Sequence, residues 1–179
     1  MKRVLLTAAA VLVGAVAVIL VLALTKPDTF AVQRSIAINA PPEKIFALLD
    51  DFRQWPQWSP YETKDPAMKR TFGATTKGPG ATYAWDGNSE VGAGHMTIAN
   101  ETAPSLVAIK LDFERPMTTT NEVRFTLVPQ GAATRVTWAM QGPAPFISKV
   151  MQVAFDLDKM VGGDFEVGLA KLKAAAEKG

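Results

Sequence analysis

The sequence predicts an α+β domain that follows an N-terminal transmembrane helix. Three observations support this prediction: an apolar run over residues 4–24, apolar residues at every second position over much of residues 81–140, and an amphipathic helical pattern near the C-terminus. We expect an antiparallel sheet of about seven strands, two short helices after the first strand, and one long C-terminal helix laid against the sheet.

The N-terminal apolar run has the length of a membrane span. As a helix, residues 4–24 would extend about 30 Å, the thickness of a bilayer hydrocarbon core. Lys2 and Arg3 precede the run, which predicts a single-pass protein with a cytoplasmic N-terminus and an extracytoplasmic domain, periplasmic if the protein is bacterial. A cleaved signal peptide ending at Ala23 is the alternative, and it would make the protein secreted.

Charge and composition exclude several classes of function. Residues 1–28, the expected anchor, carry three basic residues and one acidic residue, which accounts for the whole net charge of +2. The domain expected over residues 29–179 is therefore balanced, and it lacks the cationic surface that a nucleic-acid partner requires. With no Cys, one His and no cluster at metal-ligand spacing, the sequence predicts neither a metal site nor a cofactor.

The first half of the domain is punctuated by prolines and aromatic residues. Residues 29–40 predict a strand, and Pro41-Pro42 then opens a helix whose apolar stripe ends near Leu49. The aromatic segment over residues 52–61 predicts a second short helix, and residues 68–72 predict a short strand. Further strands are expected where apolar residues alternate with polar ones, around Tyr83, Trp85, Met96, Ile98, Val107, Ile109, Leu111, Phe113, Val123, Phe125, Leu127, Val136, Trp138 and Met140.

The C-terminal segment returns to a helical period. Residues 145–155 predict a first helical part, and apolar residues then recur on one face from Val161 to Leu172. Within this pattern we expect an irregularity at Gly162-Gly163 and a helix cap at Asp164.

Several strings of the domain occur in a recurrent order. They are Pro41-Pro42-Glu43, WPQWSP at residues 55–60, GATYAWDGN at residues 80–88, VGAGHM at residues 91–96, TRVTW at residues 134–138 and MVGGDFE at residues 160–166. Together they resemble the polyketide cyclase/dehydrase branch of the START / polyketide-cyclase (SRPBCC, helix-grip) superfamily, over residues 29–178. The resemblance implies a strongly curved sheet that grips the C-terminal helix, with a hydrophobic cavity between them. It implies no particular reaction.

Aromatic and apolar residues on the expected inward faces are the candidate cavity residues. Core packing alone would explain each one, but together they would line a cavity with Trp N–H and Tyr O–H as its few polar groups. We expect the cavity mouth between the loop over residues 73–80, other strand loops and the C-terminal helix. The candidates are Trp55, Trp58, Tyr83, Trp85, Met96, Phe113, Phe125, Trp138, Phe165 and Leu169.

No catalytic motif is found, and the catalytic residues are left unidentified. His95 alternates with Met96, which places it on the outward face of its strand, and Asp112 and Glu114 are placed outward by the same argument. The Gly-rich segment over residues 73–80 lacks the Gly-Lys-Ser/Thr ending of a phosphate loop. Tyr83 is the ionisable group that we place on an inward face.

The leading hypothesis is membrane-tethered binding or transfer of a hydrophobic small molecule, such as a lipid, an isoprenoid or a polyketide-like compound. The membrane partner would be contacted through residues 4–24. One alternative is a cyclase or dehydratase-type enzyme that uses the same cavity, with Tyr83 or a buried acid moving protons. Another is a protein-interaction module of the cell envelope, whose protein partner the sequence does not identify.

Overall fold

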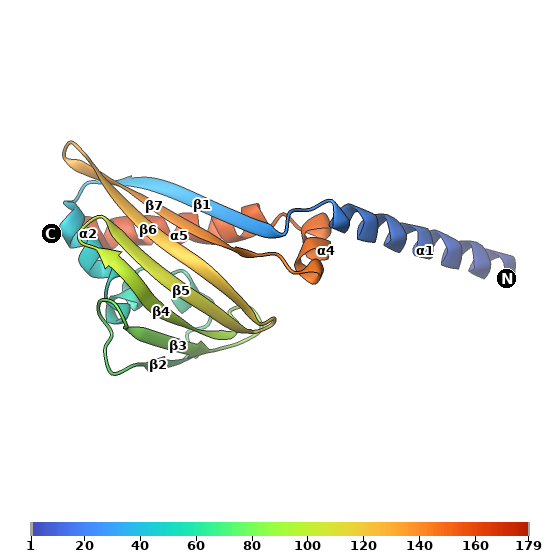
Figure 1. Cartoon of the computed structure of the whole chain (residues 1–179), viewed down its shortest axis with the longest axis horizontal. Coiled ribbons are helices and arrows are strands. Elements are labelled where there is room, and N and C mark those ends of the chain that lie inside the picture. The colour runs from blue at the N-terminus through green and yellow to red at the C-terminus, as the bar shows by residue number, and fades with distance from the viewer. Residues whose placement is uncertain (1, 179) are drawn as a thin grey trace.

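A seven-stranded antiparallel sheet forms the body of the protein (Figure 1). The computed structural model describes residues 2–178, with the side chains of residues 6, 7 and 9–178. The strand order is β1-β7-β6-β5-β4-β3-β2, so consecutive strands pair from β2 to β7 and β1 pairs with β7. The predicted antiparallel meander is confirmed. Its strands are β1 (Thr29–Ile38), β2 (Lys69–Phe72), β3 (Thr82–Asp86), β4 (Ala93–Thr102), β5 (Leu106–Arg115), β6 (Thr119–Gln130) and β7 (Ala133–Pro143).

The short helices after β1 lie where proline and the aromatic segment predict them. In α2 (Pro42–Leu49) a proline occupies the first turn, and Ile45, Phe46 and Leu49 are buried. The aromatic segment forms a 3₁₀ helix, η1 (Phe52–Gln57), and a single turn, α3 (Tyr61–Lys64), follows it. After the last strand come α4 (Phe146–Ala154) and the long α5 (Leu157–Glu177), which lies against the sheet (Figure 1).

The start of α5 differs from the sequence prediction. Asp156 caps the helix and accepts a hydrogen bond from the Lys159 N–H at 3.0 Å, so the predicted cap at Asp164 is wrong. The helix also continues without interruption through Gly162. A Cβ at Gly162 would lie 2.0 Å from Nη2 of Arg34 on β1, so a larger residue here would have to displace the end of that strand side chain.

The hydrophobic core lies between the sheet, α5 and the helices after β1. Among the described residues, the core cluster includes none before Val32 and extends to Ala176. Its fully buried large side chains include Phe52, Trp58 and Phe125. The segment from β1 to the end of α5 therefore buries its own core without any residue of α1.

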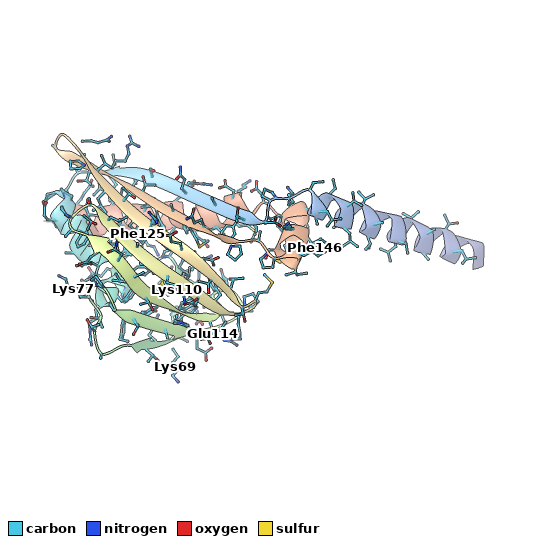
Figure 2. The ribbon with its side chains drawn as sticks, viewed as in Figure 1. Lys69, Lys77, Lys110, Glu114, Phe125 and Phe146 are labelled. Atoms are coloured by element: carbon cyan, nitrogen blue, oxygen red, sulfur yellow. The ribbon has the colours of Figure 1, made fainter. Side chains whose placement is uncertain are left out.

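Helix α1 (Lys2–Leu24) extends away from the domain, from the end where α4 lies (Figure 1). Figure 2 shows Phe146 on α4 at this junction. Among the residues that the structure describes, no helix combines the length and apolar character needed to cross a membrane. The transmembrane helix predicted over residues 4–24 is therefore not supported. The side chains of Lys2 and Arg3, on which the predicted orientation depends, lie outside those described.

Candidate ligand cavity

A cavity of about 240 Å³ lies between the sheet and the first half of α5. Its wall is formed by Trp55, Ser59, Tyr61, Glu62, Met68, Tyr83, Trp85, Glu90, Val91, Met96, Leu111, Phe113, Val123, Trp138, Met140, Val161, Asp164 and Phe165. A larger depression of about 690 Å³ covers the outward face of the sheet, but it is more open and includes Lys110 and Glu122 in its lining. The smaller cavity is the better candidate site because it is more enclosed and aromatic side chains line it.

Seven of the ten predicted cavity residues lie in this wall. They are Trp55, Tyr83, Trp85, Met96, Phe113, Trp138 and Phe165. The other three, Trp58, Phe125 and Leu169, do not line it and are at most 2% exposed. Trp58 contacts the rings of Phe125 and Trp138 edge-on, with centroids 5.7 Å apart in each pair, and so belongs to the packed core.

The cavity mouth was expected between the loop over residues 73–80, other strand loops and the C-terminal helix. The wall includes no residue of the loop over residues 73–80. It does include the β3–β4 connection at Glu90 and the C-terminal helix α5, and Glu62 joins it from α3. Neither glutamate had a periodic pattern that would have identified it. By contrast, Leu111 and Met140 lie on the same strand faces as predicted residues, so alternation alone would have been enough to find them.

A buried ion pair forms one polar part of the wall. The guanidinium of Arg70 reaches Glu62 Oε2 at 2.6 Å, and the Tyr83 hydroxyl donates to Glu62 Oε1 at 3.0 Å. The Glu62 side chain is 8% exposed. Burial, together with the adjacent Glu62 carboxylate, raises the pKa of Tyr83 well above its ordinary value. Tyr83 therefore keeps its proton at neutral pH and serves as a hydrogen-bond donor.

A second ion pair links α5 to α3 beside the cavity. Lys64 Nζ lies 2.8 Å from Asp164 Oδ2 and 3.8 Å from Glu90 Oε1. Burial, and then the Asp164 carboxylate, raise the pKa of Tyr61 above its ordinary value. The wall thus contains three carboxylates, from Glu62, Glu90 and Asp164, and none of its described residues is Lys, Arg or His.

The family model described as "Polyketide cyclase / dehydrase and lipid transport" matches residues 29–177, which is the whole sheet together with α5. The chain belongs to this family. The superfamily resemblance of the sequence motifs is thereby confirmed, whereas the match does not include the N-terminal helix. No curated protein matches the chain.

Solved structures share the fold of this polyketide cyclase/dehydrase domain at low sequence identity. A protein from Helicobacter pylori is 10% identical, with a TM-score of 0.63 over 86% of this chain and 90% of that one. The Aha1 dimer from Colwellia psychrerythraea is 20% identical, with a TM-score of 0.60 over 84% and 98%. A protein from Chromobacterium violaceum is 13% identical, with a TM-score of 0.60 over 86% and 100%.

The titratable groups on the outward face of the sheet lie apart from the cavity of this family domain. The His95 side chain is 46% exposed and lies 3.2 Å from Asp112 and 3.5 Å from Glu114, which confirms its predicted outward direction. Burial alone would raise the pKa of Asp112, but hydrogen bonds from Thr120 and Lys110 bring it below its ordinary value. Within residues 2–178, no three His, Asp or Glu side chains are arranged to hold a metal ion.

Proposed function

We propose that this protein binds and carries a neutral hydrophobic small molecule in the cavity between the sheet and α5. The observation that carries this proposal is the cavity itself, which is enclosed and lined mainly by aromatic and aliphatic side chains. The family description, which includes lipid transport, supports the same class of function.

The volume limits the size of the ligand. An engineered apolar cavity of about 150 Å³ holds benzene, and sites for drug-sized ligands span about 300–1,000 Å³. The present cavity, at about 240 Å³, lies between these limits. It suits a molecule of about two fused rings, or one end of a longer isoprenoid or lipid.

The charge of the wall favours a neutral ligand. Arg70 and Lys64 pair with the carboxylates from outside the lining, so the charged groups that face the cavity are Glu62, Glu90 and Asp164. An anionic ligand would meet these carboxylates without a cation to balance its own charge, and this carries a large cost away from water.

The proposal can be tested by calorimetric titration of residues 27–179 with 1-tetralone, a neutral two-ring ketone. Trp85 lines the cavity, so Trp85→Ala should weaken binding at least tenfold because it removes a large apolar contact. His95 does not line the cavity, so His95→Ala should leave binding unchanged. The anion 1-naphthoate should bind more weakly than 1-tetralone. Equal effects of the two substitutions, or tighter binding of 1-naphthoate, would contradict the proposal.

We propose separately that α1 holds the domain at a lipid surface, on the extracytoplasmic side that the charged flank of the sequence predicts. This proposal is supported by apolar side chains of α1 that are exposed and available to contact lipid, such as Leu12 and Val13, which are 66% and 68% exposed. Phe146, at the adjacent end of α4, is also exposed. The full chain should sediment with lipid vesicles, whereas residues 27–179 should not. Because the chain has no Cys, Ala132→Cys on an exposed turn should be labelled on intact cells by an impermeant maleimide. Equal sedimentation of the two proteins, or labelling only after lysis, would contradict this.

A further inference from the structure

The hydroxyls of Ser59 and Tyr61, two residues of the cavity wall, make no hydrogen bond to any other described side chain or backbone group. Ser59 is 5% exposed, so its hydroxyl has little access to bulk water. Both hydroxyls nevertheless keep accessible surface, because neither belongs to the fully enclosed, unpartnered side-chain atoms of the described residues, a set that includes Trp138 Nε1. Each hydroxyl can donate one hydrogen bond and accept others.

The surface that the two hydroxyls keep belongs to the cavity. Burial is the main cause that raises the pKa of Tyr61, so protein atoms surround its hydroxyl, and the Asp164 carboxylate of the same wall is the second cause. A surrounded hydroxyl that keeps surface faces an internal space, and the cavity is the space that Tyr61 lines. The Ser59 side chain consists of Cβ and Oγ, so the part that lines the cavity is the hydroxyl or the carbon that carries it.

The chain around the two hydroxyls is held in place by its backbone. The Ser59 N–H donates to the Trp55 carbonyl at 2.8 Å, at the end of η1. Pro60 packs against α5, where a Cβ added at Gly168 would lie 2.9 Å from Pro60 Cδ. Tyr61 follows directly and begins α3. Because the fold fixes this segment before a ligand arrives, binding there has a small ordering cost.

The other side-chain donors of the described wall are occupied or enclosed. The Tyr83 hydroxyl donates to Glu62, and the indoles of Trp55 and Trp85 donate to backbone carbonyls at 3.1 and 3.0 Å. Trp138 Nε1 has no partner but also has no surface that a ligand could reach. A ligand oxygen that accepts a hydrogen bond therefore finds its free donors in the segment over residues 59–61.

We propose that the hydroxyls of Ser59 and Tyr61 donate hydrogen bonds to an uncharged oxygen of the cavity ligand, the oxygen of a ketone or an alcohol. The inference rests on the proposed function, because it names the ligand chemistry of the same cavity. The aromatic and aliphatic wall holds the body of the ligand, and the two hydroxyls determine which end carries the oxygen. This oxygen is uncharged because the Asp164 carboxylate acts on the same part of the wall.

Probes that differ in one oxygen isolate these hydrogen bonds. 1-Tetralone and tetralin share two fused rings, and only 1-tetralone has a ketone. Tyr61→Phe and Ser59→Ala each remove one hydroxyl oxygen from residues 27–179. We expect each substitution to lower the ratio of dissociation constants, tetralin over 1-tetralone, about fivefold. Tyr83→Phe is the matched control, because it removes a hydroxyl that already donates to Glu62, so its ratio should stay close to the unsubstituted value.

A second readout needs no substitution in the measured protein, so it is available even if a variant fails to fold. The chain has two tyrosines, so residues 27–179 labelled with ¹³C at tyrosine Cζ give two resonances, which Tyr83→Phe assigns. 1-Tetralone should shift the Tyr61 resonance relative to tetralin, because a new hydrogen bond changes the electron density at Cζ. The Tyr83 resonance is the internal reference, since its hydroxyl is already bonded to Glu62.

The outcomes separate the two proposals. A fall in the ratio for Tyr61→Phe or Ser59→Ala that exceeds the fall for Tyr83→Phe supports the hydroxyl concerned as a donor, and so does a ketone-dependent shift at Tyr61. If both probes bind but neither the ratios nor the Tyr61 resonance respond to the ketone, the role of the two hydroxyls is overturned and the proposed function stands. If neither probe binds the unsubstituted protein, both proposals are overturned.

Discussion

Arg70 is the residue whose removal would most disturb the polar wall of the cavity. Its Nε and Nη2 both lie 2.6 Å from Glu62 Oε2, and its Nη1 donates to the Met68 carbonyl at 2.6 Å. The Glu62 side chain is 8% exposed and that of Arg70 is 25% exposed. Arg70→Met keeps an apolar stem and removes the cation, so Glu62 would be left as a buried carboxylate with the Tyr83 hydroxyl as its donor.

The size of the effect follows from burial. Removing one partner of a buried ion pair typically costs about 3–5 kcal/mol, because the remaining charge is uncompensated. We expect about 3 kcal/mol for Arg70→Met, since water reaches part of the Arg70 site and Tyr83 still donates to the carboxylate. Arg70→Met combined with Glu62→Gln leaves no buried charge, so it should cost less than Arg70→Met alone.

A surface pair on the same sheet provides the control. Arg115 pairs with Asp86, and the two side chains are 57% and 67% exposed, so Arg115→Met should cost less than about 1 kcal/mol. Urea unfolding of residues 27–179, followed by Trp fluorescence, measures each free energy of unfolding by linear extrapolation. If Arg70→Met lowers the free energy of unfolding no more than Arg115→Met does, Glu62 is not left as an uncompensated buried charge. A double variant less stable than Arg70→Met would contradict the buried ion pair in the same way.

Two further predictions concern stability. Burial raises the pKa of the Asp50 carboxyl above its ordinary value, so the folded protein binds this proton more tightly than the unfolded chain does. The folded protein therefore loses stability as the pH rises from the ordinary pKa of Asp50 to its raised pKa. Asp50→Asn also removes the carboxylate that Lys77 approaches at 3.6 Å, and it should change stability more favourably at pH 7 than near pH 3 in urea melts; an equal effect at both pH values would contradict this. Gly162→Ala must displace the Arg34 guanidinium from Asp158 and Glu166, so it should gain less stability than Gly163→Ala, which meets nothing within 4 Å and should gain up to about 1 kcal/mol in the same assay. Similar effects at the two glycines would show that Arg34 does not restrict the helix.

Alternation along the strands predicted which face each side chain occupies, but not how deep it lies. It correctly placed Trp85 and Met96 toward the interior and His95 on the outward face. Phe125 shares the inward face with these residues, yet it lies in the packed core and not in the cavity wall. Periodicity gives direction relative to the sheet, whereas the boundary between core and cavity depends on where α5 leaves space.

Contacts between distant segments account for what the sequence did not predict. The sequence predicts an irregularity at Gly162-Gly163, where glycine weakens a helix locally. In the structure, the Arg34 guanidinium from β1 occupies the space that a Cβ at Gly162 would take. The local sequence pattern around Gly162 does not indicate this contact. Glu62 lies in a one-turn helix after η1, and only the fold brings it to Arg70 and Tyr83.

We expect the cavity between the sheet and α5 to hold a neutral hydrophobic molecule. The most direct test is to purify residues 27–179 gently, extract any bound small molecule and identify it by mass spectrometry, in parallel with Val161→Phe. Val161 lines the cavity from α5, so the larger ring should fill the site and exclude the ligand. We expect a neutral apolar compound near one equivalent in the unsubstituted protein and little in Val161→Phe. An anionic compound, equal occupancy in both proteins, or a ligand-free protein that also fails to bind 1-tetralone would contradict it.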